Sequence, residues 1–586
     1  MKLSQLTRRK FLSRALKSAG TAVTSTGIAI HLSACESRAK NAGTSGEAQF
    51  DFGVASGDPL HDRVILWTRV TPAKHTSSAK SLEPIWVEWQ VARDDTFNNL
   101  VIADATTTDS SRDYTLKIDA QGLEPDTHYY YRFISGNTVS PIGRTKTLPT
   151  GNVEHINFAV VSCANYPAGL FHVYGEIAKA EDIDAVLHLG DYIYEYGRGV
   201  LASDNAAALG REVLPPKELS DLEDYRSRYA QYRSDVNLQA AHASAPFIAV
   251  WDDHEIANDT WREGAENHNE YQGEFDLRLE AALQAYAEWM PIRPSVNEEI
   301  ASLQRNFEFG NLVNLIMLDT RVVGRDQQLN LSDYIDINGD FDAVRYEADI
   351  SNPARTILGS DQRAWLQAQL TNSNTWQVLG QQVLMGNMHL PTAITTGRMS
   401  VSQFAELVAI AQAAESTPES LTPEQQQFLQ NNAGLLQLGS LPFNLDAWDG
   451  YPIERAQVLE SSIQAGNNLV VLAGDTHNAW ANNLQLGDTP AGVEFSTPSI
   501  SSPGLEALFG LSSQTDIQQT ESTLTQFIEQ LCYTNLSNRG FLLLHFTAQA
   551  VTATWKYVST VTSHQYSMLD SRSYSLTVAV NSNQIV

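Results

Sequence analysis

Cysteine is scarce in this sequence, which has 586 residues but only Cys35, Cys163 and Cys532. A disulfide framework in a chain of this size is therefore excluded. Proline and glycine are limited to 21 and 35 residues, which excludes collagen-like and low-complexity chains. Because 42% of the residues are hydrophobic, there is ample apolar material for large cores, and we expect a globular protein of several domains.

Basic residues are few compared with acidic ones. Lys and Arg total 39 against 68 Asp and Glu, which gives a formal net charge of −29. A surface this acidic repels nucleic acids and anionic membranes, so we expect no regulatory nucleic-acid binding. A phosphorylated substrate can still bind to such a protein, but only where a local cation such as a metal ion reverses the field.

The first 35 residues contain no acidic side chain and predict an export signal. Their apolar stretch, residues 19–30, is too short and too rich in Thr, Ser and Gly to span a bilayer. Residues 7–12, which include Arg8 and Arg9, resemble a twin-arginine signal. The twin-arginine export machinery carries proteins that are already folded, which implies that any metal is loaded in the cytoplasm.

A lipid anchor is a second expectation for this end of the chain. Residues 32–35 resemble a lipoprotein signal-peptidase box, in which Cys35 would become the acylated first residue of the mature protein. An ordinary cleavage region with a chance cysteine is the alternative. Residues 36–49, rich in Ser, Ala and Gly, predict a flexible tether. We therefore expect a periplasmic or cell-surface protein.

Residues 50–148 predict a small all-β domain. Short alternating runs such as Val64–Trp67 and Trp86–Val91 are separated by turn clusters. Residues 123–133 show a turn followed by aromatic residues, as where a sandwich strand begins after a corner. We expect an immunoglobulin- or fibronectin-like sandwich, with residues 145–153 as a linker.

Residues 154–586 predict an α/β domain of buried β-sheets flanked by helices. Helical stretches are expected at 221–241 and 275–289, with a helical insertion at 403–440. Continuous apolar runs without alternation suit strands buried on both faces. Each run ends in a polar cluster, and in α/β sheets ligand sites gather at the carboxyl ends of strands. These runs are Ile156–Val161, Ala185–Leu189, Phe247–Trp251, Val313–Leu318 and Leu469–Ala473.

The polar clusters contain metal-competent side chains. Asp191 and Tyr194 follow one run, and a carboxylate and a phenol can share a hard trivalent iron. Residues 252–255 place three acids and a histidine together, which repel one another unless cations or solvent intervene. Asp475 and His477 are two residues apart, so their side chains can point to the same side of an extended segment and bind neighbouring metal ions. By itself, Cys163 fits a small buried hydrophobic residue as well as a ligand.

Taken in order, these motifs resemble the PhoD-like alkaline phosphatases of the metallophosphoesterase superfamily. The resemblance runs from about Phe52 to the C-terminus. It implies an α/β metallophosphoesterase core preceded by the small all-β sandwich, and one ferric ion plus calcium as cofactors. The motifs that carry it are Phe52–Pro59, Ser162–Tyr166, Gly190–Tyr196, Trp251–Glu255, Leu318–Arg321 and Gly474–His477.

Carried over by position, the resemblance assigns the metal ligands. It implies that Cys163, Asp191, Tyr194 and His477 bind iron and that Asp191 bridges to a second metal. Asp253 and Asp475 stand where the broader superfamily has an asparagine and a histidine, and both would face the second metal. Since hard oxygen ligands favour calcium over zinc, this departure indicates Ca²⁺. Further side chains near the motifs are candidates for calcium only: Asn165, Asp252, Asn258, Gln382 and Asn387.

The resemblance implies hydrolysis of phosphate mono- or diesters by a hydroxide that the metals make available. His254 would be the catalytic residue, which protonates the leaving alkoxide or steadies the charged transition state. The alternative for His254 is a histidine that only orients Asp253. Arg321 either binds phosphate or pairs with Asp319 to hold a loop.

Two other functions remain open from the sequence. One is a phospholipase D-type phosphodiesterase, since the family resemblance spans monoesterases and diesterases. The other is a surface-binding protein with a degenerate catalytic domain. Loss of catalysis should erode metal ligands, however, and none of the six is missing.

Overall fold

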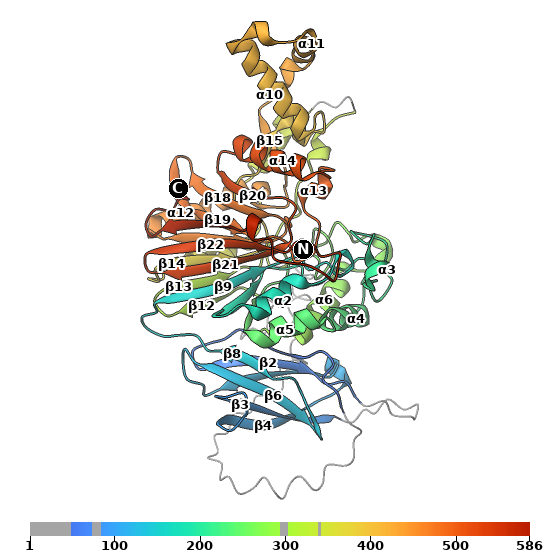
Figure 1. Ribbon diagram of the computed structural model, residues 1–586, viewed down its shortest axis with the longest axis vertical. Helices are drawn as coiled ribbons and strands as arrows, with labels where there is room; N and C mark the ends of the chain where they lie inside the picture. The colour runs from blue at the N-terminus through green and yellow to red at the C-terminus, as the bar shows by residue number, and fades with distance from the viewer. Residues whose placement is uncertain (1–47, 73–83, 294–302, 338–340, 586) are drawn as a thin grey trace, which may run out of the picture.

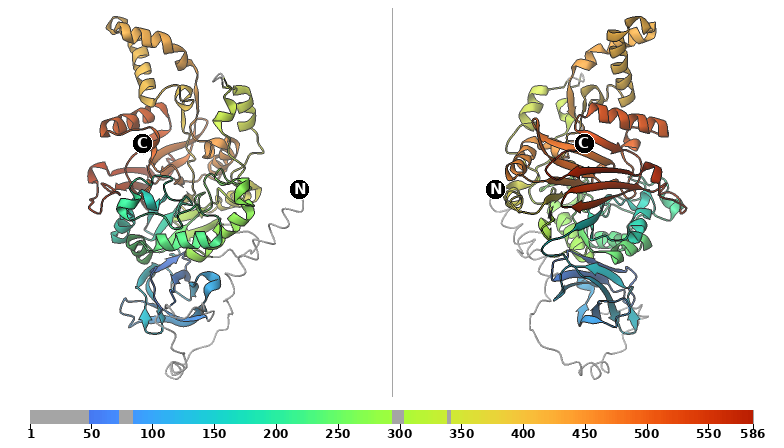
Figure 2. Two further views of the ribbon diagram at one scale, coloured as in Figure 1. Left: turned by 90° about the vertical axis from the view of Figure 1, so that its right-hand side faces the viewer. Right: turned by 60° about the vertical axis from the view of Figure 1, so that its left-hand side comes forward.

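The structure is a computed structural model that describes residues 48–72, 84–293, 303–337 and 341–585. The predicted export signal, Cys35 and nearly all of the predicted tether lie outside the described residues. Two large sheets form the centre of the molecule, with a smaller sheet at one end and a helical arm at the other (Figures 1 and 2). Among the described residues, no helix combines the length and apolar character needed to cross a membrane.

The N-terminal region is all-β, as the sequence predicts. Its outer sheet has the order β4-β3-β6-β7, with β8 also paired to β6. Tyr129, Tyr131 and Phe133 alternate along β6 and are buried against apolar side chains of the facing strands. The strands are β1 Val54–Gly57, β2 Arg63–Arg69, β3 Ile85–Ala92, β4 Leu100–Thr108, β5 Thr115–Gln121, β6 His128–Ser135, β7 Thr138–Val139 and β8 Gly143–Lys146. The expected linker thus begins later, since Thr145 and Lys146 still pair with β6.

A nine-stranded sheet joins this region to the rest of the molecule. Its order is β23-β22-β21-β9-β10-β11-β1-β2-β5. Three central strands are parallel: β9 His155–Val161, β10 Ala185–His188 and β11 Phe247–Ala249. One edge is extended by the antiparallel strands β21 Gly540–Thr547, β22 Ala550–Tyr557 and β23 Tyr574–Ala579. Gly57 of β1 pairs with Phe247 of β11, so the second layer of the sandwich is continuous with the central sheet.

The second central sheet has seven strands in the order β12-β13-β14-β17-β19-β18-β20. Strands β13, β14, β17 and β19 run parallel, which matches the uninterrupted apolar runs of β13 and β17. The strands are β12 Arg305–Phe309, β13 Val313–Met317, β14 Trp376–Gly380, β17 Leu469–Ala473, β18 Ala479–Leu486, β19 Thr489–Ser496 and β20 Leu531–Asn535.

The two large sheets pack face to face through one apolar core. Phe158 of β9 lies 4.9 Å from Phe309 of β12, measured between ring centroids, and 5.9 Å from Phe546 of β21. Helices cover the outer faces of both sheets, so the domain has four layers in the order helix, sheet, sheet, helix. The nine-stranded sheet packs against α2 His172–Lys179, α4 Leu222–Arg233, α5 Val236–Ser244 and α6 Phe275–Trp289. The seven-stranded sheet packs against α8 Gly359–Gln369, α12 Pro452–Ala465 and α14 Gln514–Phe527.

The expected insertion is a helical arm, which projects away from the sheets in each view (Figures 1 and 2). It consists of α9 Thr392–Thr395, α10 Val401–Ser416 and α11 Pro423–Asn432. The arm leaves and rejoins the body through β15 His389–Pro391 and β16 Ser440–Pro442, which pair with each other. Three further helices, α3 Ala206–Leu209, α7 Ala343–Ile350 and α13 Leu505–Leu508, lie in connecting segments.

Candidate metal centre

The loops that follow parallel strands of both large sheets meet at one place. Cys163 follows β9 and Asp191 follows β10. Asp253 follows β11, while Asp475 and His477 follow β17 of the other sheet. Parallel strands have their carboxyl ends at the same edge of a sheet, so the loops that follow them lie side by side. Because the two sheets pack face to face, the loops of one sheet contact the loops of the other.

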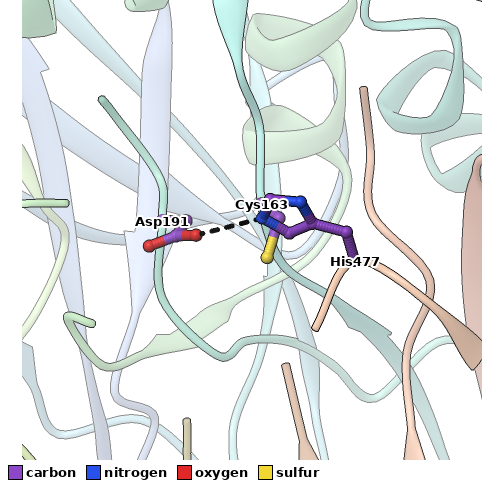
Figure 3. Close-up of side chains that lie close together, drawn as sticks. All are labelled: Cys163, Asp191 and His477. Atoms are coloured by element: carbon purple, nitrogen blue, oxygen red, sulfur yellow. Dashed lines mark ion pairs between the residues drawn. The ribbon is translucent and has the colours of Figure 1, made fainter. Parts of the chain in front are cut away.

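The first cluster contains a thiol, a carboxylate and an imidazole. Ligand atoms of Cys163, Asp191 and His477 lie within 4.8 Å of one another, and the three side chains point toward a common centre (Figure 3). His477 Nε2 is 3.7 Å from Asp191 Oδ2. The other ring nitrogen, Nδ1, lies 2.7 Å from the Pro503 carbonyl oxygen and donates to it, which leaves the Nε2 lone pair facing the cluster.

Tyr194 adds a phenol to this cluster. Its hydroxyl donates to Asp191 Oδ2 at 2.9 Å and lies 3.0 Å from His477 Nε2. It also lies 2.7 Å from the Ser502 hydroxyl. The structure therefore brings together the four residues that the family resemblance implies as iron ligands.

The second cluster contains only carboxylates. Ligand atoms of Asp252, Asp253 and Asp475 lie within 4.8 Å of one another. A further group of the same size joins Asp191, Asp253 and His254. Asp191 and Asp253 thus connect the two clusters, and the geometry suits two cations that share a carboxylate ligand.

Four of these residues have strained backbones. The φ angles of Cys163, Asp191, Asp475 and His477 are 61°, 53°, 60° and 61°. Residues other than glycine rarely adopt this left-handed region, and each such residue costs about 1–3 kcal/mol unless its surroundings hold it. Such strain gathers at functional sites, and here it falls on both clusters.

Gly190 allows the loops after β10 and β11 to approach each other. A Cβ atom at this position would lie 2.4 Å from Asp252 Cβ, and the φ angle of Gly190 is +103°. Glu255 links the same two loops through hydrogen bonds. Its carboxylate accepts hydrogen bonds from the amides of Asp191 at 3.1 Å and Asp252 at 2.7 Å, and from the amide of Tyr192.

Electrostatics in the centre favour bound cations. Burial and neighbouring carboxylates raise the pKa values of Asp252 and Asp475 well above the ordinary range. Burial also raises the pKa of the Cys163 thiol and of the Tyr194 phenol. For Asp253 burial acts the same way, but Arg321 and His254 outweigh it and lower its pKa to about 2. A cation at the centre would relieve this repulsion and favour the charged forms.

Two carboxylate oxygens of the centre are available to bind a metal ion. Within the described part of the chain, Asp191 Oδ1 and Asp252 Oδ2 are buried without a hydrogen-bond partner. An unpaired buried carboxylate oxygen is costly, whereas a metal ion would satisfy it. The donors present, sulfur, phenol, imidazole and carboxylate, are suitable for metal binding.

Comparison with known proteins agrees with this geometry. The model of the PhoD-like phosphatase family matches residues 158–555, and the model of its N-terminal domain matches residues 35–149. The chain belongs to the PhoD-like phosphatase family. It is 36% identical over 509 residues to alkaline phosphatase D of Bacillus subtilis (strain 168), a match that covers 85% of this chain and 76% of that protein. A solved structure described as "Structure of PhoD" aligns with a TM-score of 0.72 at 30% identity, covering 92% of this chain and 91% of that one.

Family membership identifies the chain as a hydrolase that acts on phosphoric ester bonds. The fold predicted from the sequence, an α/β core with buried sheets and an N-terminal all-β sandwich, is confirmed by the same structural match. In this PhoD-like phosphatase the six predicted metal ligands also lie together in one centre. This arrangement argues against a surface-binding protein with a degenerate catalytic domain.

His254 of this PhoD-like phosphatase is held by a carboxylate. Its Nδ1 lies 2.7 Å from Glu195 Oε2. Glu195 also accepts hydrogen bonds from the Asn258 amide at 2.8 Å and the Asn267 side chain at 3.1 Å. Burial opposes charge on the histidine, but Asp253 and Glu195 outweigh it and raise the pKa of His254 well above the usual value. Sequence reasoning gave Glu195 no role, although its acidic side chain in the Gly190–Tyr196 motif was a signal.

The other polar candidates for calcium differ in their hydrogen bonds. Gln382 donates to the carbonyls of Trp251 at 2.7 Å and Leu318 at 3.1 Å, so its amide braces loops of both sheets. The Asn258 side chain donates to Glu266 at 2.7 Å, and that of Asn165 donates to the Leu201 carbonyl at 3.4 Å. Asn165 Oδ1 and Asn387 Oδ1 are both buried, with no hydrogen-bond partner among the described residues.

The guanidinium of Arg321 does not pair with Asp319, which was one of the two expectations for this residue. The Asp319 carboxylate accepts the backbone amides of Arg321 and Val322, each at 2.9 Å, and does not pair with the guanidinium. The guanidinium instead pairs with Asp252 at 2.5 Å and Asp446 at 2.8 Å. Its donors therefore all face carboxylates, with Asp475 as the third partner at 3.3 Å.

Proposed function

We propose that this chain is an exported, metal-dependent phosphatase or phosphodiesterase that uses Fe³⁺ and Ca²⁺. The observation that carries the proposal is the position of Asp191, whose carboxylate belongs to two ligand groups and has one buried oxygen without a hydrogen-bond partner in the described chain. A carboxylate in this setting can hold two cations next to each other, as two-metal hydrolysis of phosphate esters requires.

The donor types support different metals in the two clusters. Thiolate, phenolate, imidazole and carboxylate from Cys163, Tyr194, His477 and Asp191 form a mixed set suited to ferric iron. Asp252, Asp253 and Asp475 offer only hard oxygen atoms, which suit calcium.

Once bound, the cations would neutralise the phosphoryl oxygens and lower the pKa of a water molecule, which supplies hydroxide for in-line attack at phosphorus. The chain's own residues orient the reaction. Glu195 fixes the His254 ring through Nδ1, which leaves Nε2 as the nitrogen available to the leaving oxygen. We assign His254 to protonating that oxygen or stabilising its charge, on the basis of this geometry and its place beside Asp253.

Hydrolysis of nitrophenyl phosphate and bis(nitrophenyl) phosphate, with metal analysis of the same samples, tests this function. We expect a chelator to abolish hydrolysis, and iron together with calcium to restore it. The ratio of the two rates assigns the preference between monoesters and diesters. Full activity in a sample shown to contain neither iron nor calcium would contradict the proposal.

Export by the twin-arginine route is part of the proposal, supported by Arg8 and Arg9 in the N-terminal segment. The double variant Arg8→Lys, Arg9→Lys should remain in the cytoplasm and be active there, because metal loading precedes transport. Normal secretion of this variant would show that another route serves the protein.

A lipid anchor at Cys35 is tested separately, with Cys532→Ala as the matched cysteine control. Cys35→Ala should move the protein from the membrane fraction to the soluble fraction. Unchanged fractionation would mean that Cys35 is not acylated.

A further inference from the structure

Arg321 lies at the centre of the carboxylate cluster. Its side chain is fully buried, and its Nε donates to Asp252 Oδ1 at 2.5 Å. Nη1 donates to Asp446 Oδ1 at 2.8 Å, and Nη2 donates to Asp475 Oδ1 at 3.3 Å. Nη2 also lies 3.6 Å from Asp253 Oδ1. One guanidinium therefore contacts every carboxylate of the proposed calcium cluster.

The segment that presents this guanidinium is held rigidly. Gln362 accepts a hydrogen bond from the Asp319 amide at 2.8 Å and donates one to the Asp319 carbonyl at 2.7 Å. The Asp319 carboxylate in turn accepts the amides of Arg321 and Val322. The backbone at Arg321 is therefore held by the buried side chains of Gln362 and Asp319.

The far end of the guanidinium is held by a second arginine through a shared carboxylate. Asp446 Oδ1 lies 2.5 Å from Arg325 Nη2 and 2.8 Å from Arg321 Nη1. The Asn444 side chain accepts the Asp446 amide at 2.9 Å. Asp446 follows β16, so the segment by which the helical arm rejoins the body contributes to this contact.

The contacts of Arg321 determine which carboxylate oxygen of Asp252 has no hydrogen-bond partner. Arg321 pairs with Oδ1 of Asp252, and it is Oδ2 of the same carboxylate that has no hydrogen-bond partner among the described residues. Asp252 lies in the loop after β11 of the nine-stranded sheet, and Asp475 lies in the loop after β17 of the seven-stranded sheet. The guanidinium therefore joins carboxylates from both sheets across their packing interface, and its planar fork sets their orientation.

We propose that Arg321 is a positioning residue for the calcium cluster, and that Asp446, held by Arg325, keeps it in place. It fixes the orientation of the Asp252, Asp253 and Asp475 carboxylates around one position and leaves Asp252 Oδ2 open, and it contacts neither substrate nor reacting atoms. This inference rests on the proposed function, because the carboxylate cluster must bind calcium.

Positioning and simple charge compensation predict opposite results. If Arg321 served only as a countercharge, its removal would leave the cluster more negative and calcium would bind more tightly. If Arg321 positions the carboxylates, its removal weakens calcium binding even though the cluster gains negative charge. Arg321→Lys keeps the charge but loses the planar fork, so it separates geometry from charge.

The experiment is calorimetric titration of calcium chloride into the iron-loaded enzyme after calcium has been removed with EGTA. We expect Arg321→Gln and Arg321→Lys to bind calcium about 10- to 100-fold more weakly than the wild type, the range for loss of a group that orients metal ligands. Iron content and circular dichroism should match the wild type. Calcium affinity that is unchanged or increased in either folded variant would overturn the positioning role.

A second variant covers the case in which Arg321→Gln does not fold. Asp446→Asn leaves Arg321 and the calcium ligands intact but weakens the hold on the guanidinium. It should also lower calcium affinity, and unchanged affinity in this variant would overturn the proposal.

Arg455→Gln is the matched control. Arg455 pairs with the buried Asp449 at 2.6 Å, a comparable ion pair that includes none of the proposed metal ligands, so calcium affinity should not change. Absence of calcium binding by the wild-type enzyme would contradict the proposed function. Equal binding by wild type and variants would contradict only the role of Arg321.

Discussion

The two halves of the metal centre differ in donor chemistry although they share a carboxylate. The first half combines Cys163, Tyr194 and His477 with Asp191, while the second consists of Asp252, Asp253 and Asp475. Within the described residues, Asp191 in the first half pairs with a histidine, whereas Asp252 and Asp475 in the second half pair with an arginine, Arg321. The comparison teaches that the same strand-end scaffold can prepare adjacent positions for a mixed-donor metal and for a hard oxygen-binding metal.

Removing the shared carboxylate should have the largest effect on hydrolysis, because Asp191 belongs to the ligand groups of both halves. Asp191→Asn replaces a carboxylate with a neutral amide that cannot hold two cations together. We expect hydrolysis to fall by more than the roughly 10²- to 10³-fold that loss of one stabilising group costs. Rates should be measured on folded protein with its metals analysed, and wild-type-like activity would disprove the site.

A matched pair of variants should separate the halves. Cys163→Ser removes a ligand from the first cluster only and should deplete iron before calcium. Asp475→Asn removes an oxygen ligand from the second cluster and should weaken calcium binding about tenfold or more while iron is retained. Elemental analysis after dialysis measures both metals. Equal loss of both metals in each variant would mean that the clusters do not act as separate subsites.

An optical experiment sharpens the assignment of the first half. A phenolate bound to ferric iron absorbs visible light, whereas a calcium or zinc site does not. The purified enzyme should therefore be coloured, and Tyr194→Phe should bleach or strongly shift the band, with a smaller loss of activity than in Asp191→Asn. An unchanged band in Tyr194→Phe would assign the colour to another group, such as the Cys163 thiolate. A colourless, iron-free and fully active wild type would remove iron from the proposal.

The smallest expected effect on hydrolysis concerns the contact between the loops that supply both halves, because this contact affects stability and not a metal ligand. Gly190→Ala should destabilise the protein by about 1–2 kcal/mol through its left-handed backbone and by about 1–3 kcal/mol more through the clash with Asp252. Gly199→Ala is the control, since Gly199 also has a positive φ of +75° but a Cβ there would meet no described atom within 4 Å. Urea unfolding compares the two variants, and equal destabilisation would show that the loop contact tolerates a methyl group.

Local pattern predicted much of the fold. The apolar run at 469–473 coincides with β17, and the helix expected at 275–289 coincides with α6. The helix expected at 221–241 proved to be two helices, because Ser234 and Asp235 end α4 and cap α5. The continuity of β1 with β11 was not predictable, since a single parallel pair between Gly57 and Phe247 leaves no periodic signal in the sequence.

Local sequence patterns specify which residue types follow each buried strand and therefore which side chains are available to a metal centre. These are local properties, because apolar runs specify strands and the polar residues after them must turn. Which of those side chains come into contact depends on tertiary packing. Glu195 lies 59 positions from His254, and Arg321 lies 69 positions from Asp252 and 125 from Asp446. Such pairings depend on how two sheets pack against each other and on the loop conformations that the packing enforces, and no local pattern records either.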